Sequence, residues 1–323
     1  MLKRFGIFFS GLVLLAATNA ALAQQVQLPP LIKIVVPFAA GASTDLTARA
    51  VAVQLGRRLG INVIVENRAG GSTFIGAGAV AKSPKDGSML LYTSVSTVTA
   101  AATMRTVPMD INTELAPVAL LSEGPLVVVA SAKTDIKTPA DLVAAARARP
   151  DTITYGSAGV GTVSHVAGEL LNDAAKIELK HIPYKGTATA MSDFVAGRID
   201  LMIGLTYQSI AAQVQAGNAR VIGVATAQPQ PAFPGVPTMA SVASGYSVAF
   251  WAGFFAPVGT PPALIQRLNH ELNEVAKSKE VLALIEPDGL TPGALTPEQF
   301  GSRVRSSYAA WKQLAVAKNI LVE

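Results

Sequence analysis

Hydrophobic positions fall into short β-branched runs that alternate with longer stretches of helical periodicity. The first run, residues 32–36, predicts a buried strand that ends at Pro37, because proline has no N–H for a sheet. A small-residue loop follows, and Ser43 or Thr44 is a natural N-cap for a helix over residues 46–55. A strand, a small loop and a helix start together leave free backbone N–H groups that bind anions, although an ordinary βα turn has the same pattern.

The same alternation continues through the first half of the chain. Strands are predicted at 61–65 and 88–93, with helical sequence at 74–82 between them. A β-α-β-α-β order predicts an α/β fold with a parallel sheet covered by helices on both faces. Two further strands, 115–121 and 126–130, are separated by residues 122–125, which we interpret as a crossing point into a second lobe.

The second half repeats the arrangement. Thr138 and Asp141 are typical of a capping box, and a second strand, small-residue loop and helix start lies at residues 156–165. Further strands are predicted at 179–182, 199–203, 220–226 and 250–256, and helices at 189–196, 210–216, 261–276 and 297–317. Open α/β sheets bind ligands at the carboxyl ends of their strands, so two facing lobes predict a ligand cleft between them. We expect the first lobe to comprise residues 24–123 and 226–323, and the second lobe residues 124–225.

The N-terminus has the features of a secretory signal peptide over residues 1–23. Lys3 and Arg4 precede an apolar run at 5–17, and small residues at 21–23 suit cleavage before Gln24. The run is short for a membrane span, which is the alternative. Cysteine is absent from the sequence, so no thiol is available for a lipid anchor or a disulfide. We therefore expect an exported protein in the periplasm.

Charge and composition exclude several classes of protein. The formal net charge is +5, falls to +3 without Lys3 and Arg4, and is scattered without basic blocks, which argues against nucleic acid as a partner. No G-x-S-x-G sequence or metal-ligand spacing occurs, so no cofactor, metal or catalytic residue is predicted. Residues 76–81 match a dinucleotide fingerprint, but small-residue helix packing explains them better.

Single residues leave alternatives open. His165, at a helix start, reaches the cleft or bonds a backbone carbonyl, and Lys185 pairs with a carboxylate or is solvated. Phe38 and Tyr184 are cleft walls or ordinary core residues. Asp45, in a first helical turn, is stabilised by the helix dipole in any case.

Six motifs in order resemble the Bug family of periplasmic solute-binding proteins, the receptors of tripartite tricarboxylate transporters. The motifs are Val36-Pro37-Phe38 with Gly41 and Thr44-Asp45; Val65-Glu66-Asn67-Arg68-Ala69-Gly70; Asp86-Gly87; Gly156–Thr162 with His165–Leu170; Pro183-Tyr184-Lys185-Gly186; and Phe254–Pro261. The resemblance covers residues from about Ile32 to Ala317. It implies a type II periplasmic binding protein fold, with two lobes that close on a small organic carboxylate and deliver it to a membrane permease.

The resemblance also implies which residues bind the ligand. On one side of the cleft they are Phe38, Ala39, Ala40, Gly41, Ser43, Thr44 and Asp45; on the other they are Gly159, Gly161, Thr162 and His165; and Ser94, Thr97, Lys185, Gly186, Thr187 and Gly204 line the remainder. The family often has an aspartate where this chain has Gly204, which favours a simple carboxylate over an amino acid.

Two other functions remain as alternatives. A receptor that passes its ligand-bound state to a signalling partner would have the same sequence features. An exported hydrolase would use Ser164 or Thr162 with a histidine. We expect a monomeric carrier without enzymatic activity.

Overall fold

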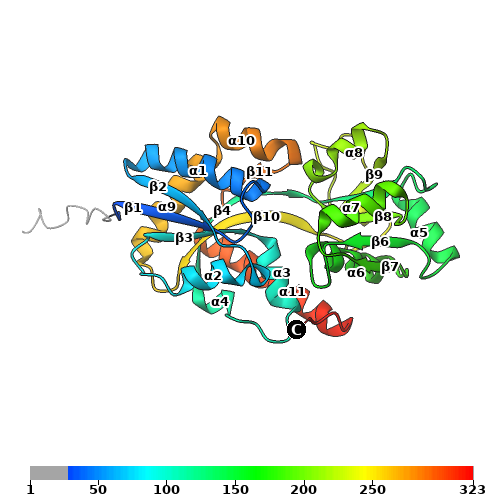
Figure 1. Cartoon of the computed structure of the whole chain (residues 1–323), viewed down its shortest axis with the longest axis horizontal. Coiled ribbons are helices and arrows are strands. Elements are labelled where there is room, and N and C mark those ends of the chain that lie inside the picture. Colours follow the sequence, from blue (N-terminus) through cyan, green and yellow to red (C-terminus); the bar gives the residue numbers. More distant parts are fainter. Residues whose placement is uncertain (1–27, 323) are drawn as a thin grey trace, which may run out of the picture.

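Two lobes, each built on its own β-sheet, lie side by side along the long axis of the molecule (Figure 1). The structure is a computed structural model and describes residues 28–322, so the predicted signal peptide lies outside the described residues. Among the described helices, none is both long and apolar enough to cross a membrane.

The first lobe contains a six-stranded sheet of order β11-β4-β10-β3-β1-β2. Its strands are β1 (Leu31–Val36), β2 (Asn62–Asn67), β3 (Met89–Ser94), β4 (Leu115–Pro125), β10 (Ala249–Pro257) and β11 (Thr291–Pro292). β1 pairs in parallel with β2 and β3, whereas β10 runs antiparallel to β3 and β4. The parallel arrangement predicted for the first three strands is therefore confirmed, and β4 runs in the same direction as they do. β10 runs the opposite way, because it returns from the second lobe and enters between β3 and β4.

Helices cover both faces of this sheet. They are α1 (Ser43–Leu59), α2 (Phe74–Ala81), α3 (Val95–Thr103), α4 (Ile111–Glu114), α9 (Pro262–Ala276), α10 (Lys279–Ile285) and α11 (Pro297–Ala317), with short 3₁₀ turns η1 (Gly71–Thr73) and η4 (Glu286–Asp288). Ile34 packs in a buried cluster with α1 and α9, and its neighbour Val35 packs in the opposite cluster with α3 and α11. Successive side chains of a strand point to opposite faces, so the apolar run of β1 fills two cores.

The second lobe contains a five-stranded sheet of order β7-β6-β8-β5-β9. Its strands are β5 (Val127–Ser131), β6 (Thr154–Ser157), β7 (Lys180–Pro183), β8 (Leu201–Leu205) and β9 (Ala219–Val224). The helices are α5 (Pro139–Ala148), α6 (Val163–Ala175), α7 (Thr187–Ala196) and α8 (Ala211–Gln215), with 3₁₀ turns η2 (Tyr207–Ser209) and η3 (Met239–Ser241). Leu142 and Leu171 bring α5 and α6 against one face, and Phe194 of α7 packs against the other.

The chain crosses between the lobes at two neighbouring points. Residues 122–125, predicted as a break between strands, instead form the end of β4, where Gly124 pairs with Phe250 of β10. The Ala225 N–H donates to the Leu126 carbonyl at 2.7 Å, and the Val248 N–H donates to the Ala225 carbonyl at 2.7 Å. These bonds hold the outgoing and returning chains together at the hinge.

The return crossing lies later than the expected boundary at residue 226. Met239, Ala243 and Tyr246 belong to the same buried cluster as Leu142 and Leu171 of the second lobe. Their apolar side chains bury themselves against the second sheet before the chain enters β10. Whether the lobes move as separate units with the expected boundaries stays a prediction.

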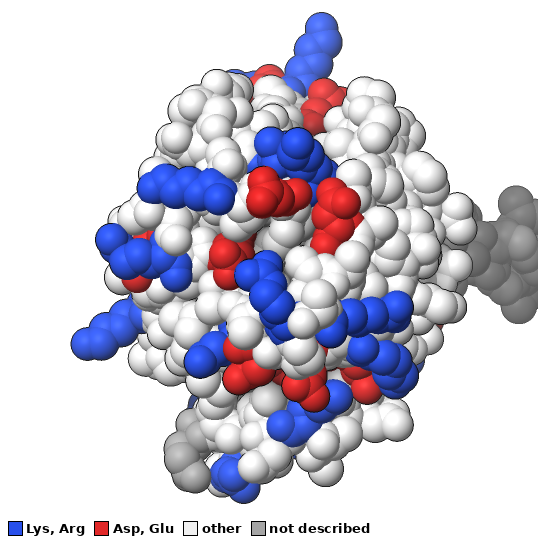
Figure 2. Space-filling view, turned by 90° about the vertical axis from the view of Figure 1, so that its right-hand side faces the viewer, with Lys and Arg blue, Asp and Glu red and all other residues white. Residues whose placement is uncertain are grey.

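Charges are mixed on the outer end of the second lobe. Figure 2 shows Lys and Arg interspersed with Asp and Glu on this face, without a large patch of one sign. Such a surface lacks the single-sign field with which nucleic-acid-binding proteins attract phosphates.

Candidate functional site

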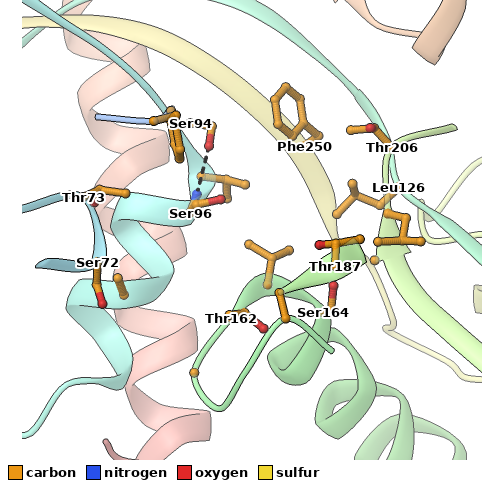
Figure 3. Close-up of a pocket in the computed structure, with 18 of the residues that line it drawn as sticks. Ser72, Thr73, Ser94, Ser96, Leu126, Thr162, Ser164, Thr187, Thr206 and Phe250 are labelled. Carbon is orange, nitrogen blue, oxygen red and sulfur yellow. Dashed lines mark hydrogen bonds between the residues drawn. The ribbon is translucent and has the colours of Figure 1, made fainter. Parts of the chain in front are cut away.

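A cavity of about 520 Å³ lies between the lobes and is lined by the starts of helices from both (Figure 3). Its lining comes from the β1–α1 loop and the start of α1, η1, α3 from its start to its end, the β6–α6 loop and the start of α6, the start of α7, the end of β8 with the turn after it, and the start of β10, together with Leu126 and Val322. Of the predicted ligand-binding residues, the cavity is lined by Phe38, Ser43, Thr44, Ser94, Gly161, Thr162, Thr187 and Gly204. The remaining predicted residues, Ala39, Ala40, Gly41, Asp45, Thr97, Gly159, His165, Lys185 and Gly186, lie outside this lining. Which of them touch a ligand stays a prediction.

The start of α1 presents backbone N–H groups to the cavity. Its N-cap is Ala42, with no side-chain cap, so the expected cap at Ser43 or Thr44 is wrong: both residues already lie inside the helix. The first intrahelical bond runs from the Leu46 N–H to the Ala42 carbonyl. The N–H groups before Leu46 therefore have no partner within the helix and remain available for an anion.

Asp45 is engaged within the first lobe. Its carboxylate accepts from the Gly41 N–H at 2.8 Å and from the Asn67 amide at 2.9 Å, and it pairs with Arg49 at 3.0 Å. Burial acts to raise the pKa of Asp45, but these donors together hold it below its ordinary value. The Asp45 side chain thus holds the β1–α1 loop through its hydrogen bond with the Gly41 N–H.

The start of α6 lies across the cavity. The N-cap Thr162 donates its hydroxyl to the Gly159 carbonyl at 2.7 Å, so it gives no side-chain cap to its own helix. Gly161 has a φ of +78°, and a Cβ there would lie 2.7 Å from Thr103 Oγ1. The Thr103 hydroxyl, at the end of α3, shares its one proton between the Thr99 carbonyl of its own helix at 2.9 Å and the Gly161 carbonyl of the other lobe at 3.2 Å.

His165 supports the glycine loop instead of lining the cavity. Its Nδ1 accepts from the Gly161 N–H at 3.0 Å, and its ring stacks on His181 at 3.9 Å. His181 in turn contacts Ser157 Oγ at 2.6 Å. Burial lowers the pKa of His165 to about 4, and burial with the nearby His165 lowers that of His181 to about 3. Both rings are therefore neutral near pH 7, and their hydrogen-bonding contacts with Gly161 and Ser157 hold the glycine loop in place.

Other predicted residues are also satisfied internally. The buried hydroxyls of Thr97 and Thr93 bond to each other at 2.6 Å. Gly204 has a φ of +74°, and a Cβ there would lie 3.1 Å from the Ala167 Cβ. This backbone favours glycine, which gives a physical reason for the absence of an aspartate at this position.

Sequence reasoning missed several lining residues. They include the hydroxyl side chains of Ser72, Thr73, Ser96, Thr206 and Ser209 and the apolar side chains of Val95, Leu126 and Phe250. Ser164, which the sequence suggested only for the hydrolase alternative, lines the cavity too. Ser72 and Thr73 follow Gly70 and Gly71 in a turn with four successive positive φ angles. The Thr73 hydroxyl is buried and has no hydrogen-bond partner in the described part of the chain. The Gly70-Gly71 pair in the sequence indicates a turn, but it does not indicate that Ser72 and Thr73 also adopt positive φ angles.

The cavity is electrically neutral in its side chains. None of the described residues that line it is Lys, Arg, His, Asp or Glu. Its polar groups are hydroxyls and backbone groups, and the starts of α1, α6 and α7 direct the positive ends of their helix dipoles at it. The start of α3 is capped by Ser94 Oγ, which accepts from the Ser96 N–H at 3.3 Å, and the end of α3 at Thr103 and Met104 lines the cavity as well. The described residues also include no cluster of side chains suited to a metal ion. Such a lining offers an anion dipoles and hydrogen bonds instead of charged side chains.

A second contact between the lobes lies beside the cavity. The Gln208 N–H of η2 donates to Asp288 Oδ1 of η4 at 2.6 Å, and Asp288 is buried. Burial raises the pKa of Asp288 above its ordinary value, although the Gln208 N–H and the Thr206 hydroxyl oppose that shift. This bond and the Thr103–Gly161 bond join the two lobes across the cleft.

Comparisons with known proteins agree with this geometry. The chain matches the family model described as "Tripartite tricarboxylate transporter family receptor" over residues 47–320. It is 33% identical to Protein BugT of Bordetella pertussis, over 87% of this chain and 86% of BugT. A structure of R. palustris Rpa4515 with adipate has a TM-score of 0.77 and 30% identity, covering 90% of this chain and 97% of that one. MatC from Rhodopseudomonas palustris with bound malate has a TM-score of 0.75 and 26% identity, covering 89% of this chain and 100% of that one.

Proposed function

Since the chain belongs to the tripartite tricarboxylate transporter receptor family, we propose that it captures a small organic carboxylate in the cavity between its lobes and delivers it to the permease of such a transporter. The protein is a periplasmic solute-binding receptor of the Bug type. Relatives bind adipate and malate, which supports a carboxylate as the ligand of this chain.

One observation carries the proposal. Helices of both lobes, α1 and α3 on one side and α6 and α7 on the other, begin at the same cavity. A carboxylate that bridges these starts makes contacts with both lobes only when they are close together. Its binding energy therefore favours the closed arrangement, which a permease can distinguish from the open one.

Catalysis is not part of the proposal. Ser157 and His181 form the short hydroxyl–imidazole contact, but Ser157 is fully buried and His181 is stacked on His165. Ser164 lines the cavity, while the Nδ1 of the adjacent His165 is occupied by the Gly161 N–H. These histidines hold the loop, which supports a receptor without turnover.

We further propose that residues 1–23 are removed on export and that the receptor acts as a monomer. The charged start, apolar run and small-residue site of the sequence support cleavage before Gln24. Intact mass of the exported protein tests the cleavage, and light scattering on the purified protein tests the monomer.

Thermal unfolding with a panel of mono-, di- and tricarboxylates tests the ligand class. A ligand present at 100 times its Kd is expected to add about 2.7 kcal/mol of stability. For a protein of this size the melting temperature should rise by several degrees, at roughly 2–4 °C per kcal/mol. Native mass spectrometry of the purified protein checks for a carboxylate that is already bound. If no acid shifts the melting temperature and no ligand is trapped, the proposal is wrong.

A further inference from the structure

The last described residues of the chain, 318–322, fold back after α11 and form a strap on the end of α3. Figure 1 shows this end of the chain in red, near α3 and α11. The Val322 N–H donates to the Thr103 carbonyl at 2.8 Å, and the Arg105 N–H donates to the Val322 carbonyl at 2.8 Å. Val322 is therefore held in place by backbone hydrogen bonds through both of its polar groups.

The strap also contacts the second lobe. Lys318 Nζ lies 3.3 Å from Asp173 Oδ1 of α6. Ile320 belongs to the same buried cluster as Val166, which also lies on α6. The strap thus joins the two lobes at a place separate from the two crossings of the chain.

Val322 forms part of the cavity wall at the end of α3. This wall is made by Thr103, Met104, Gly161 and Val322, which all line the cavity. A Cβ on Gly161 would lie 3.5 Å from Val322 Cγ2, so this methyl group packs beside the glycine loop of the other lobe. The backbone N–H and C=O groups of Met104, Gly161 and Val322 all have hydrogen-bond partners within the protein. An acid in the cavity therefore meets side chains at this wall and no free backbone group of these three residues.

The wall is fixed when the lobes are together. Moving Val322 outward would break its two backbone bonds to α3 and separate Ile320 from the cluster that contains Val166. Lost backbone hydrogen bonds and lost apolar burial both cost free energy. We therefore expect an acid that is too large for the cavity to hold the lobes apart instead of displacing the strap.

We propose that Val322 is a specificity-determining residue, whose side chain sets how much room the closed cavity leaves for the carbon chain of the acid. The inference rests on the proposed carboxylate-binding function and adds the selection of ligand size within it. The C-terminal strap then acts in two ways, as a contact between the lobes and as a wall of the binding site.

Calorimetry with the full mature chain and the linear dicarboxylates malonate, succinate, glutarate, adipate and pimelate tests the inference. Val322→Ala removes two methyl groups from the wall and should move the preferred length towards the next longer acid, with a gain of about fourfold for each additional methylene that is buried. Val322→Phe fills part of the cavity and should weaken the longest acid that the parent protein binds by about tenfold, while the shortest is affected least.

Two variants of the same strap are controls. Leu321 packs in the first-lobe cluster and lies outside the cavity lining, so Leu321→Ala should leave the length preference unchanged. Lys318→Gln breaks the ion pair with Asp173 and leaves the lining intact, so it should weaken every acid by one common factor of no more than about fivefold. Melting temperatures of the ligand-free variants show which of them are folded, and Val322→Ala carries the test if Val322→Phe is not.

The outcomes are distinct. The parent's length preference in both Val322 variants, or an equal change in Leu321→Ala, would overturn the role of Val322 and leave the receptor function intact. If only a branched or aromatic acid of the wider panel binds, the variants are compared on that acid, and an unchanged Kd in both Val322 variants would again overturn the role. Absence of binding by every acid, with no trapped ligand, would overturn the receptor function as well.

Discussion

Proline in place of Ser43 would remove one backbone N–H from the start of α1 and leave the helix in place. Proline fits the first helical position, since that N–H has no intrahelical partner. The preceding residue, Ala42, has φ −67° and ψ 157°, a conformation that a following proline permits. The same chain already begins α5, α9 and α11 with proline.

The expected effect of Ser43→Pro follows from the charge of the ligand. A hydrogen bond to a charged group contributes about 1.5–3 kcal/mol, which corresponds to a roughly 10- to 150-fold increase in Kd. Calorimetry with the tightest-binding acid of the panel measures this change. The melting temperature of the ligand-free variant should stay close to that of the parent protein.

Ser43→Ala is the matched control, because it removes the hydroxyl and keeps the N–H. If Ser43→Pro binds like the parent while Ser43→Ala is weakened, hydroxyl groups and not helix N–H groups hold the carboxylate. That result would refute the mechanism by which a neutral cavity binds an anion.

Three further predictions concern the supports of the site. His165 and His181 have pKa values near 4 and 3 when folded, below the ordinary 6.5, so the unfolded chain binds their protons first. The free energy of unfolding should be highest above pH 6.5 and should fall as the pH drops from 6.5 towards 4, by up to about 1.4 kcal/mol per pH unit for each ring. Urea denaturation at a series of pH values measures this dependence, and a free energy that does not change with pH contradicts it. Asp288→Ala should cost about 1–3 kcal/mol by leaving the Gln208 N–H unpaired. Asp288→Asn keeps an oxygen that accepts from the Gln208 N–H. Burial raises the pKa of Asp288, so the parent protein buries an unfavourable charge at pH 7, and the variant should be at least as stable there. In acid the parent carboxyl is protonated and the variant should lose this advantage, which urea denaturation at neutral and acidic pH measures. Gly204→Ala should lower the melting temperature more than Gly217→Ala, since both have a φ near +74° but only the first is crowded; equal losses would show that backbone strain alone decides.

Local signals in the sequence predicted the elements that bring the site together. Thr138 forms the predicted capping box of α5, and α11 spans Pro297–Ala317 as its periodicity indicated. The β1–α1 loop and the glycine loop before α6 both reach the cavity. These features depend on neighbouring residues, which is why sequence reasoning reaches them.

Contacts between distant segments could not be predicted. Phe250 lines the cavity because β10 inserts between β3 and β4 at a crossing that no local pattern specifies. His165 faces Gly161 and His181, a pairing that depends on how β7 lies beside β6. The predicted end of the strand before residue 122 was wrong for the same reason, since pairing with β10 carries β4 through polar residues and a proline.

The position of β10 also determines when the first lobe can be completed during folding. β10 lies between β3 and β4, yet the whole second lobe separates it from them in the sequence. The second sheet is formed from one continuous segment, Val127–Val224, and has all of its strands before β10 emerges. Since distant pairings form slowly, the second lobe is expected to fold first, while the first lobe waits with an unfilled gap in its sheet.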